Sequence, residues 1–252
     1  MLKTIDNQTI YYEKHGQNKN TILILPGWGN TRKTFNYLIN NLKEKYTIYI
    51  LDYPGFGNSK IPNKTLTIYD YAKIINKLIK ELNITNPVII SHSFGGRITS
   101  LLISKYKLKV KKLILIDVSG IKTKKSLKIY FKEKLYKLLK KFIKLFPKRK
   151  RNYLKQKLLN LFASIDYKSL PNTMHETFKN IINEDLSIHY KNIYQETLIL
   201  WGQKDQDTPL KNAYKLKKLI SNSELIIFEN ASHYSYLNYP YLTLKIIEEF
   251  LK

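Results

Sequence analysis

Short apolar runs alternate with segments of helical periodicity along most of the 252-residue chain. Six of these runs are nearly continuous in apolar residues, at 21–25, 46–51, 88–90, 113–116, 198–200 and 225–228. Such runs are typical of strands buried on both faces, as parallel strands are. Helical spacing is found between and after them, at 67–82, 94–106, 209–220 and 239–251. This order predicts an α/β fold with a mostly parallel central sheet flanked by helices.

The remaining segments predict the edge of this sheet and one insertion. Residues 2–5 and 9–13 flank an Asp-Asn turn and predict an antiparallel hairpin at the sheet edge. Between 120 and 196 no clear central strand is found, and the alternation resumes only afterwards. A chain of this length commonly forms one domain around one core. We therefore predict one α/β core formed by 1–119 and 197–252, with 120–196 as a helical lid insertion.

The formal net charge of +25 raises the question of a polyanionic partner. Lysine accounts for 40 of the 44 basic residues, since only four arginines occur, and Asn, Ile and Tyr are also abundant. That composition is typical of an AT-rich coding sequence. A nucleic-acid reader usually favours arginine for bidentate contacts and carries a recognisable module, and neither is found in this sequence. Nucleic acid is therefore not an expected partner.

Other compositional features concern the compartment and the cofactors. Cysteine is absent, which excludes disulfides and thiolate metal sites and fits a reducing compartment. Residues 1–16 contain no apolar stretch of signal-peptide length, and the longest aliphatic runs, such as 22–25, are strand-sized. We therefore expect a cytoplasmic protein without a membrane span, and we expect no cofactor and no bound metal.

The segment SHSFGG, residues 91–96, follows one predicted strand and leads into a predicted helix. Ser93 lies two positions from Ser91 and two from Gly95, and a strained nucleophile elbow requires small residues at those positions. The Ser93 hydroxyl would lie above the sheet at a helix N-terminus, where backbone N–H groups favour developing negative charge. The alternative is that Ser93 only caps the helix, a position that serine prefers.

A second glycine-containing segment, PGWGN at 26–30, follows the predicted strand 21–25. In a hydrolase with a nucleophile elbow, the loop at this place contributes one backbone N–H group to the oxyanion hole, and the residue after the nucleophile contributes another. The candidates are the N–H groups of Trp28 and Phe94. The alternative is an ordinary glycine-rich turn ahead of a helix. A further motif, DYPGFGNS at 52–59, follows the next predicted strand.

Taken in order, these motifs resemble those of the α/β-hydrolase superfamily, over the whole chain apart from the insertion. The motifs are PGWG, DYPGFGNS, SHSFGG, WGQKDQDTP at 201–209 and ASHYSYLNYP at 231–240. The resemblance implies that Asp205, three residues after Gly202 and four before Pro209, is the catalytic acid. It also implies that His233, seven residues before Pro240, is the catalytic histidine.

The chemistry of Ser93, Asp205 and His233 is consistent with that implication. A serine hydroxyl becomes a nucleophile when an imidazole takes its proton, and the imidazole needs a carboxylate to fix its tautomer and stabilise its charge. The three residues also occur in the chain order of the fold. Two other carboxylates are candidates for the acid: Asp117, which ends another predicted strand, and then Asp207, which shares the loop of Asp205.

Three positions depart from the usual residues of the family. Ser91 replaces the first glycine of the elbow, which is a sterically mild change. Pro26 replaces a histidine that often forms hydrogen bonds in its loop, but the oxyanion donors are backbone groups. Ser232 replaces the glycine before His233. His92, the variable residue of the elbow, is expected to pack rather than to catalyse.

The first half of the insertion is strongly basic. From 121 to 157 it contains 16 basic residues and one acidic residue, a local excess of 16 − 1 = +15. Apolar residues recur every three or four positions and predict an amphipathic helix, which Pro147 ends or kinks. These apolar residues are Leu127, Phe131, Leu135, Leu138, Phe142 and Leu145. Insertions at this point in the family form lids that shape the acyl pocket, so the apolar face is expected to cover the active site. The alternative is peripheral docking on anionic lipid or on an acidic carrier protein.

The leading functional hypothesis is a serine hydrolase that cleaves carboxylic esters of small-molecule acyl substrates through an acyl-serine intermediate. The alternatives with the same three residues are a thioester or acyl-carrier-linked methyl-ester hydrolase and a carbon–carbon bond hydrolase. Haloalkane and epoxide chemistry is disfavoured, because those relatives carry Asp where this chain has Ser93. The remaining alternative is a non-catalytic binding protein on the same fold, against which the intact residues argue.

Overall fold

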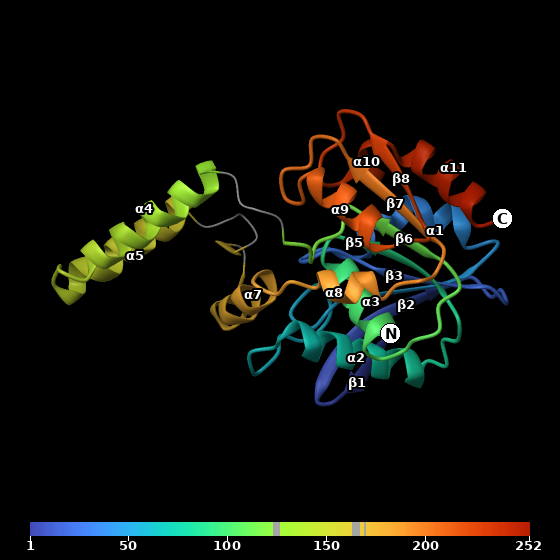
Figure 1. The fold of residues 1–252 in the computed structure, drawn as a ribbon. Helices are drawn as coiled ribbons and strands as arrows, with labels where there is room; N and C mark the ends of the chain where they lie inside the picture. The colour runs from blue at the N-terminus through green and yellow to red at the C-terminus, as the bar shows by residue number, and fades with distance from the viewer. Residues whose placement is uncertain (123–126, 163–166, 169) are drawn as a thin grey trace.

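The computed structural model describes residues 1–122, 127–162, 167–168 and 170–252, and its centre is one sheet of eight strands (Figure 1). The strand order is β1-β2-β4-β3-β5-β6-β7-β8. β1 and β2 pair antiparallel with each other, and β2 pairs antiparallel with β4, whereas all later pairings are parallel. The bounds are β1 Leu2–Ile5, β2 Gln8–His15, β3 Thr21–Leu25, β4 Thr47–Leu51, β5 Val88–His92, β6 Leu113–Ile116, β7 Thr197–Gly202 and β8 Ser223–Phe228. The predicted α/β class with a mostly parallel sheet is confirmed.

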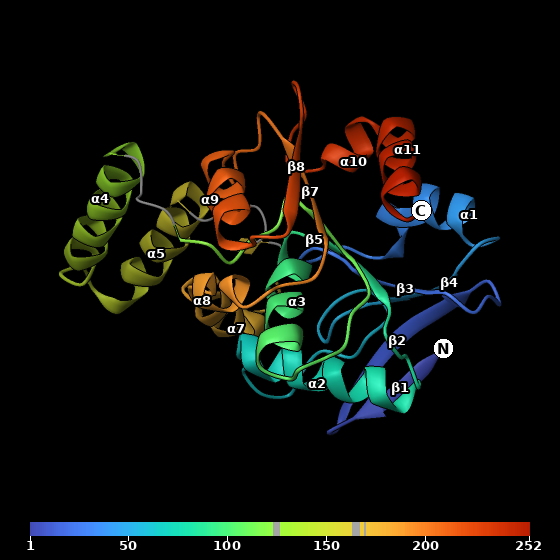
Figure 2. The same cartoon turned by 45° about the vertical axis from the view of Figure 1, so that its right-hand side comes forward.

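Helices cover both faces of this sheet (Figures 1 and 2). One face packs against three helices: α2 Ile68–Glu81, α3 Phe94–Ser104 and α9 Lys211–Leu219. The other packs against two, α1 Asn36–Leu42 and α11 Pro240–Phe250. Two short elements, η1 Arg32–Phe35 and α10 Ser235–Asn238, add Phe35 and Tyr236 to the second apolar cluster. Both faces of the central strands β3, β5, β6 and β7 are therefore shielded from solvent.

Strand β3 shows why the central runs are continuously apolar. Successive side chains of a strand point to opposite faces. Ile22 and Ile24 join the cluster beneath α1 and α11, whereas Leu23 and Leu25 join the cluster beneath α2 and α3. All four side chains are at most 1% exposed. Because helices cover both faces, no position of the strand favours a polar residue.

Local sequence signals account for the ends of several elements. Asp6 and Asn7, between β1 and β2, both have left-handed backbone angles, with φ of 46° and 63°, as a two-residue hairpin turn requires. Thr67 and Asp70 form a capping box that begins α2. The sequence analysis did not predict α1, which has only seven residues and is too short for a clear periodic signal.

In its described residues, the interval 120–196 contains helices and no strand. These elements are α4 Leu127–Ile143, α5 Lys148–Phe162, η2 Asn172–Met174, α7 His175–Ile182 and α8 Ser187–Lys191. α4 and α5 form a hairpin that extends away from the sheet, with Pro147 in its turn (Figure 1). Residues 123–126, 163–166 and 169 of the predicted lid lie outside the described residues, and the lid role stays a prediction. Across the described chain, no helix combines the length and apolarity needed to span a bilayer.

Candidate active site

The turn from β5 to α3 places Ser93 at the carboxyl end of a central strand. Ser93 has φ 45° and ψ −108°, a backbone conformation that is rare for residues other than glycine. Its side chain forms no capping hydrogen bond with α3, so its hydroxyl does not serve as a helix cap. A Cβ atom on Gly95 would lie 2.0 Å from the carbonyl oxygen of Leu25, so only glycine fits there.

Ser91, which replaces the usual glycine of the elbow, is fully buried. Its Oγ lies 2.6 Å from Oγ1 of Thr99, and the Thr99 hydroxyl in turn donates to the carbonyl oxygen of Gly95 at 3.0 Å. The hydroxyl that the substitution adds is therefore hydrogen-bonded inside the elbow. A buried polar group with a partner costs little, which explains how serine is accommodated at this position.

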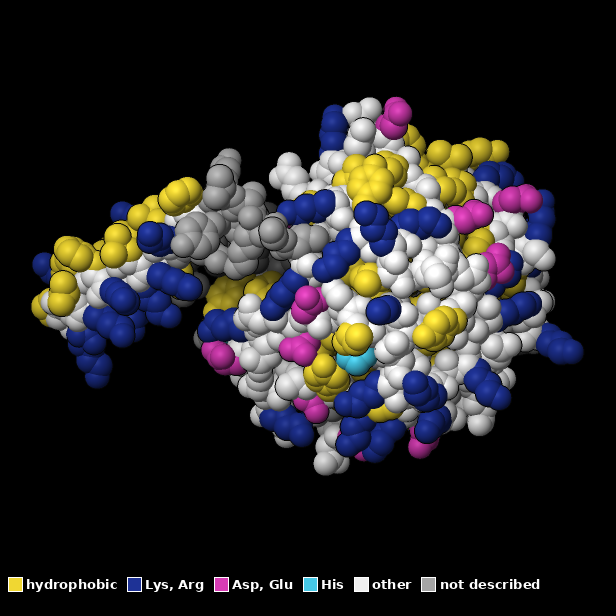
Figure 3. Space-filling view, in the orientation of Figure 1, with side chains coloured by type: hydrophobic (Ala, Val, Ile, Leu, Met, Phe, Trp, Pro, Cys, Tyr) yellow, Lys and Arg dark blue, Asp and Glu magenta, His cyan; other side chains and the backbone are white. Residues whose placement is uncertain are grey.

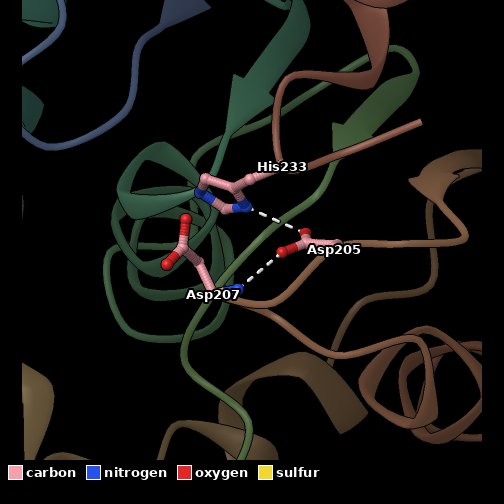
Figure 4. Close-up of side chains that lie close together, drawn as sticks. All are labelled: Asp205, Asp207 and His233. Carbon is pink, nitrogen blue, oxygen red and sulfur yellow. Dashed lines mark hydrogen bonds and ion pairs between the residues drawn. The ribbon is translucent and has the colours of Figure 1, made fainter.

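Asp205 and His233 meet between the loops that follow β7 and β8. Asp205 Oδ2 lies 2.8 Å from His233 Nδ1, and the Asp205 side chain is fully buried (Figure 4). Asp205 Oδ1 accepts hydrogen bonds from the backbone N–H groups of Asp207 and Thr208, both at 2.8 Å. Thr208 Oγ1 lies 2.5 Å from Asp205 Oδ2. The carboxylate is fixed by these contacts, and it holds the imidazole through Nδ1.

Asp207 occupies a different position in the same loop. It is exposed, and its backbone N–H rather than its carboxylate contacts Asp205 (Figure 4). Asp205, Asp207 and His233 each place one potential metal-ligand atom within 4.8 Å of the others. The nearest atoms of Asp205 and His233 are already hydrogen-bonded to each other. This arrangement suits an acid that orients an imidazole.

Asp117 bonds to segments on either side of this pair rather than to the His233 ring. Its Oδ1 accepts a hydrogen bond from the Gly202 N–H at 2.7 Å. Its Oδ2 accepts from the N–H and the hydroxyl of Ser235, at 3.1 and 2.6 Å. Burial raises the pKa of Asp117 to about 7. Asp117 thus connects the strand that leads to Asp205 with the helix that follows His233.

His92 is fully buried against the loop that carries His233. Its Nε2–H donates to the backbone oxygen of His233 at 2.8 Å, and the two ring centroids are 4.9 Å apart. Asn30 Nδ2 lies 3.4 Å from His92 Nδ1, and the Tyr234 hydroxyl donates to Asn30 Oδ1 at 3.4 Å. Burial lowers the pKa of His92 to about 3, so the ring is neutral. Because Ser93 follows His92, this contact ties the elbow to the histidine loop.

Trp28 and Phe94 bring the loop after β3 next to the elbow. Their ring centroids are 5.1 Å apart. Trp28 also contacts Phe56 of the PGFG segment at 4.6 Å and Phe178 of α7 at 5.6 Å, measured between centroids. Within the described residues, the backbone N–H groups of Trp28 and Phe94 have no hydrogen-bond partner. Neither N–H group is therefore engaged by another described residue, and their role in an oxyanion hole stays a prediction.

The protonation of His233 depends on two opposing effects. Burial disfavours the charged ring, but the hydrogen bond and the charge of Asp205 outweigh it, so the pKa of His233 is raised above its usual 6.5. The charges of Asp117 and Asp207 act in the same direction. The site therefore stabilises the imidazolium form.

Sequence analysis missed two residues that connect the site, Thr208 and Ser235. Thr208 Oγ1 contacts Asp205 and also lies 3.1 Å from the carbonyl oxygen of Asp117. Ser235 supplies both donors to Asp117 Oδ2. Each lies within a motif, three residues after Asp205 and two after His233. The only sequence signal for these contacts was the presence of a hydroxyl side chain at each of the two positions.

Comparison with known proteins agrees with this fold. A family model described as the alpha/beta hydrolase fold matches residues 20–240. The chain belongs to the alpha/beta hydrolase fold family. It is 27% identical to a pimeloyl-[acyl-carrier protein] methyl ester esterase of Wigglesworthia glossinidia brevipalpis, over 94% of this chain and 95% of that relative.

Two further alpha/beta hydrolase comparisons cover nearly the whole chain. It is 24% identical to 2-hydroxy-6-oxononadienedioate/2-hydroxy-6-oxononatrienedioate hydrolase 1 of Pseudomonas putida, over 96% of this chain and 91% of that relative. The solved structure of an esterase from Exiguobacterium antarcticum has a TM-score of 0.75 and 24% identity, and the match covers 100% of this chain and 98% of that one. The solved structure supports the fold, and the family and the two curated relatives support hydrolase activity.

Replacing Asp117 with alanine is expected to lower the free energy of unfolding by about 1–3 kcal/mol, because buried N–H groups of Gly202 and Ser235 lose their acceptor. The loss should be larger near pH 5 than near pH 8. Since burial raises the pKa from 3.8 to about 7, the stabilising contribution of this group is greatest at low pH and is lost as the pH rises through 7. Urea unfolding at both pH values measures this.

The matched control for this prediction is Asp207→Ala, which removes an exposed carboxylate from the neighbouring loop. Its effect on the free energy of unfolding should stay within about 0.5 kcal/mol. Equal stability of Asp117→Ala and the unsubstituted protein at both pH values would contradict the connecting role of Asp117.

Proposed function

We propose that this chain is a serine hydrolase that cleaves carboxylic esters of small acyl substrates through an acyl-serine intermediate. Ser93 is the nucleophile, and His233 is the general base. Asp205 orients the imidazole of His233 and stabilises its charged form. The observation that carries the proposal is the 2.8 Å contact between buried Asp205 and His233 Nδ1, beside the strained turn of Ser93. An imidazole held in this way offers Nε2 to a serine hydroxyl.

The proposed first step transfers the Ser93 hydroxyl proton to His233 Nε2 while Ser93 Oγ bonds to the ester carbonyl carbon. The carbonyl oxygen becomes an oxyanion, which the free N–H groups of Trp28 and Phe94 stabilise. The intermediate then collapses, the carbon–oxygen bond to the leaving group breaks, and His233 returns the proton to the leaving alkoxide as alcohol. Water then attacks the acyl-serine with the same base, which releases the carboxylic acid and restores Ser93.

The hydrogen-bond pattern favours Asp205 over the other two candidate acids. Asp205 contacts Nδ1 directly, whereas Asp117 bonds to backbone and hydroxyl groups of Gly202 and Ser235. An acid that keeps its proton until about pH 7 is also a weak partner for an imidazolium ion at neutral pH.

A second candidate reaction is hydrolysis of a methyl ester on an acyl group that is linked to a carrier protein. The observation that favours it is the similarity to the methyl ester esterase of Wigglesworthia, which extends over 94% of this chain. The bond broken would still be a carboxylic ester, and methanol would be the leaving group. A carbon–carbon bond hydrolase has weaker support, from the 24% identity to the Pseudomonas putida enzyme.

Release of p-nitrophenol from esters of increasing acyl length tests the leading proposal. With substrate in excess over a high concentration of the unsubstituted protein, a burst of p-nitrophenol should precede the steady state, because acylation of Ser93 releases this product before the acyl-serine is hydrolysed. Ser93→Ala should lose at least about 10³-fold in kcat, because no acyl-enzyme can form. Ser91→Ala is the matched control, since it removes a neighbouring hydroxyl and should keep the burst. A Ser93→Ala variant as active as the unsubstituted protein would refute the proposal.

The pH dependence of kcat/KM tests the role of Asp205. Activity requires neutral His233, so it should rise with pH through the pKa of His233, with a midpoint above 6.5. Asp205→Asn removes the charge that stabilises the imidazolium, so its midpoint should move to lower pH, and its activity should fall about 10³- to 10⁴-fold.

Two matched variants complete the test of the acid. Asp207→Asn changes an exposed carboxylate and should keep most of the activity. Asp117→Asn changes the other buried candidate. A larger loss of activity in Asp117→Asn than in Asp205→Asn, at equal folded fraction, would assign the acid to Asp117 instead.

A further inference from the structure

The α4–α5 hairpin projects from the main body (Figures 1 and 2). Ile143 of α4 and Leu158 of α5 are buried, at 7% and 6% exposed. The rings of Tyr136 and Phe162 contact each other across the two helices at a centroid distance of 5.5 Å. At the turn, the guanidinium group of Arg151 donates to the carbonyl oxygens of Lys144 and Phe146, at 3.1 to 3.3 Å. These bonds satisfy carbonyl oxygens of the turn that joins α4 to α5.

One face of α4 carries a row of large apolar side chains that stays exposed. We name it the hairpin ridge, and it consists of Phe131, Leu135, Leu138 and Phe142 of α4, together with Leu145 in the turn that follows. Their exposed fractions are 61%, 49%, 64%, 59% and 78%. Spacings of four and three residues put the four residues of α4 on one side of the helix, and Leu145 follows two residues beyond its end. Figure 3 shows apolar side chains along one edge of the projecting hairpin.

This exposure differs from the expectation that the apolar face covers the active site. The side chains of the hairpin ridge face solvent. In the site region, the ring of Trp28 packs against Phe178 of α7. Exposed apolar surface of this kind is costly in water and usually marks a site of interaction. The hairpin ridge therefore indicates a binding partner outside this chain.

The charge around the ridge restricts what that partner can be. From 134 to 162 the sequence contains eleven basic residues and no acidic residue. Lys134, Lys137, Lys141 and Lys144 are exposed and follow one flank of the ridge. A second copy of the chain would bring the same positive charge to the contact and be repelled. The partner must therefore be anionic as well as apolar.

We propose that the α4–α5 hairpin docks on an anionic lipid bilayer. A helix with Phe and Leu on one face and lysines beside them is suited to the boundary between headgroups and acyl chains. The ridge runs along one edge of the projecting hairpin, so a deformable surface can contact it without a matching groove (Figure 3). The lysines attract acidic headgroups at the same time. Docking of this kind is independent of the proposed ester hydrolysis.

Flotation with lipid vesicles tests the proposal without requiring turnover. The full chain is mixed with vesicles of phosphatidylcholine, alone or combined with phosphatidylglycerol. The protein should float only with the mixed vesicles. Raising the ionic strength from about 0.1 M to about 1 M shortens the Debye length from about 10 Å to about 3 Å and should weaken the binding.

Two sets of substitutions separate charge from apolar contact. Lys137→Glu, Lys141→Glu and Lys144→Glu together should weaken binding by more than about 100-fold, since each lysine contributes about fivefold near an anionic surface. Leu138→Ser with Phe142→Ser should also release the protein from the mixed vesicles. The control of equal net charge is Lys19→Glu, Lys80→Glu and Lys109→Glu on the main body, which should bind as the unsubstituted protein does. Thermal unfolding confirms that each variant is folded.

Three outcomes would overturn the proposal. The first is no flotation with phosphatidylglycerol vesicles. The second is equal binding by the hairpin lysine variant and the main-body control. The third is absence of vesicle binding together with binding to a purified acidic carrier protein that depends on the same lysines, which would assign the ridge to a protein partner. None of these results bears on ester hydrolysis, which the assays of Ser93→Ala decide.

Discussion

Four neighbouring parallel strands end at one edge of the sheet, and this constraint assembles the site. β5, β6, β7 and β8 lie side by side in that order, and all run in the same direction. The carboxyl ends of these parallel strands therefore lie at the same edge of the sheet. Open α/β sheets bind their ligands at this edge. Each of the four ends leads into one residue of the site: Ser93, Asp117, Asp205 and His233.

Hydrogen bonds then give different roles to residues of similar type. Asp117 and Asp205 are both buried carboxylates near His233. Asp205 faces the imidazole nitrogen, whereas Asp117 is enclosed by donors from Gly202 and Ser235. In a buried environment a charged group requires such partners, so the contacts determine which acid acts on the ring. Asp117 instead fixes the distance between the loops that hold Asp205 and His233.

Local features of the fold could be predicted from sequence, because they depend on neighbouring residues. Strand runs, the Asp-Asn hairpin turn and the helix that follows Ser93 are of this kind. The contacts that organise the site join residues far apart in the chain: 118 positions separate Asp117 from Ser235, and 141 separate His92 from His233. Nothing in the local pattern at His92 indicates that its ring supports the backbone of His233.

The amphipathic helix of the insertion illustrates the same limit. The spacing of Leu135, Leu138 and Phe142 predicts which residues share a face, and the structure has a helix at this place. The spacing does not indicate whether that face meets the core or the solvent, because this depends on where the hairpin lies relative to the sheet. The structure leaves the face exposed, with exposed lysines beside it.

The central claim is that Ser93 is an activated nucleophile, and covalent labelling measures this most directly. A fluorophosphonate probe reacts with serine hydroxyls whose proton is taken by a neighbouring base. Intact-mass measurement of the labelled protein should show one adduct per chain, and peptide mapping should place it on Ser93. A folded protein that takes up no probe, or that carries the adduct on another residue, would contradict the account.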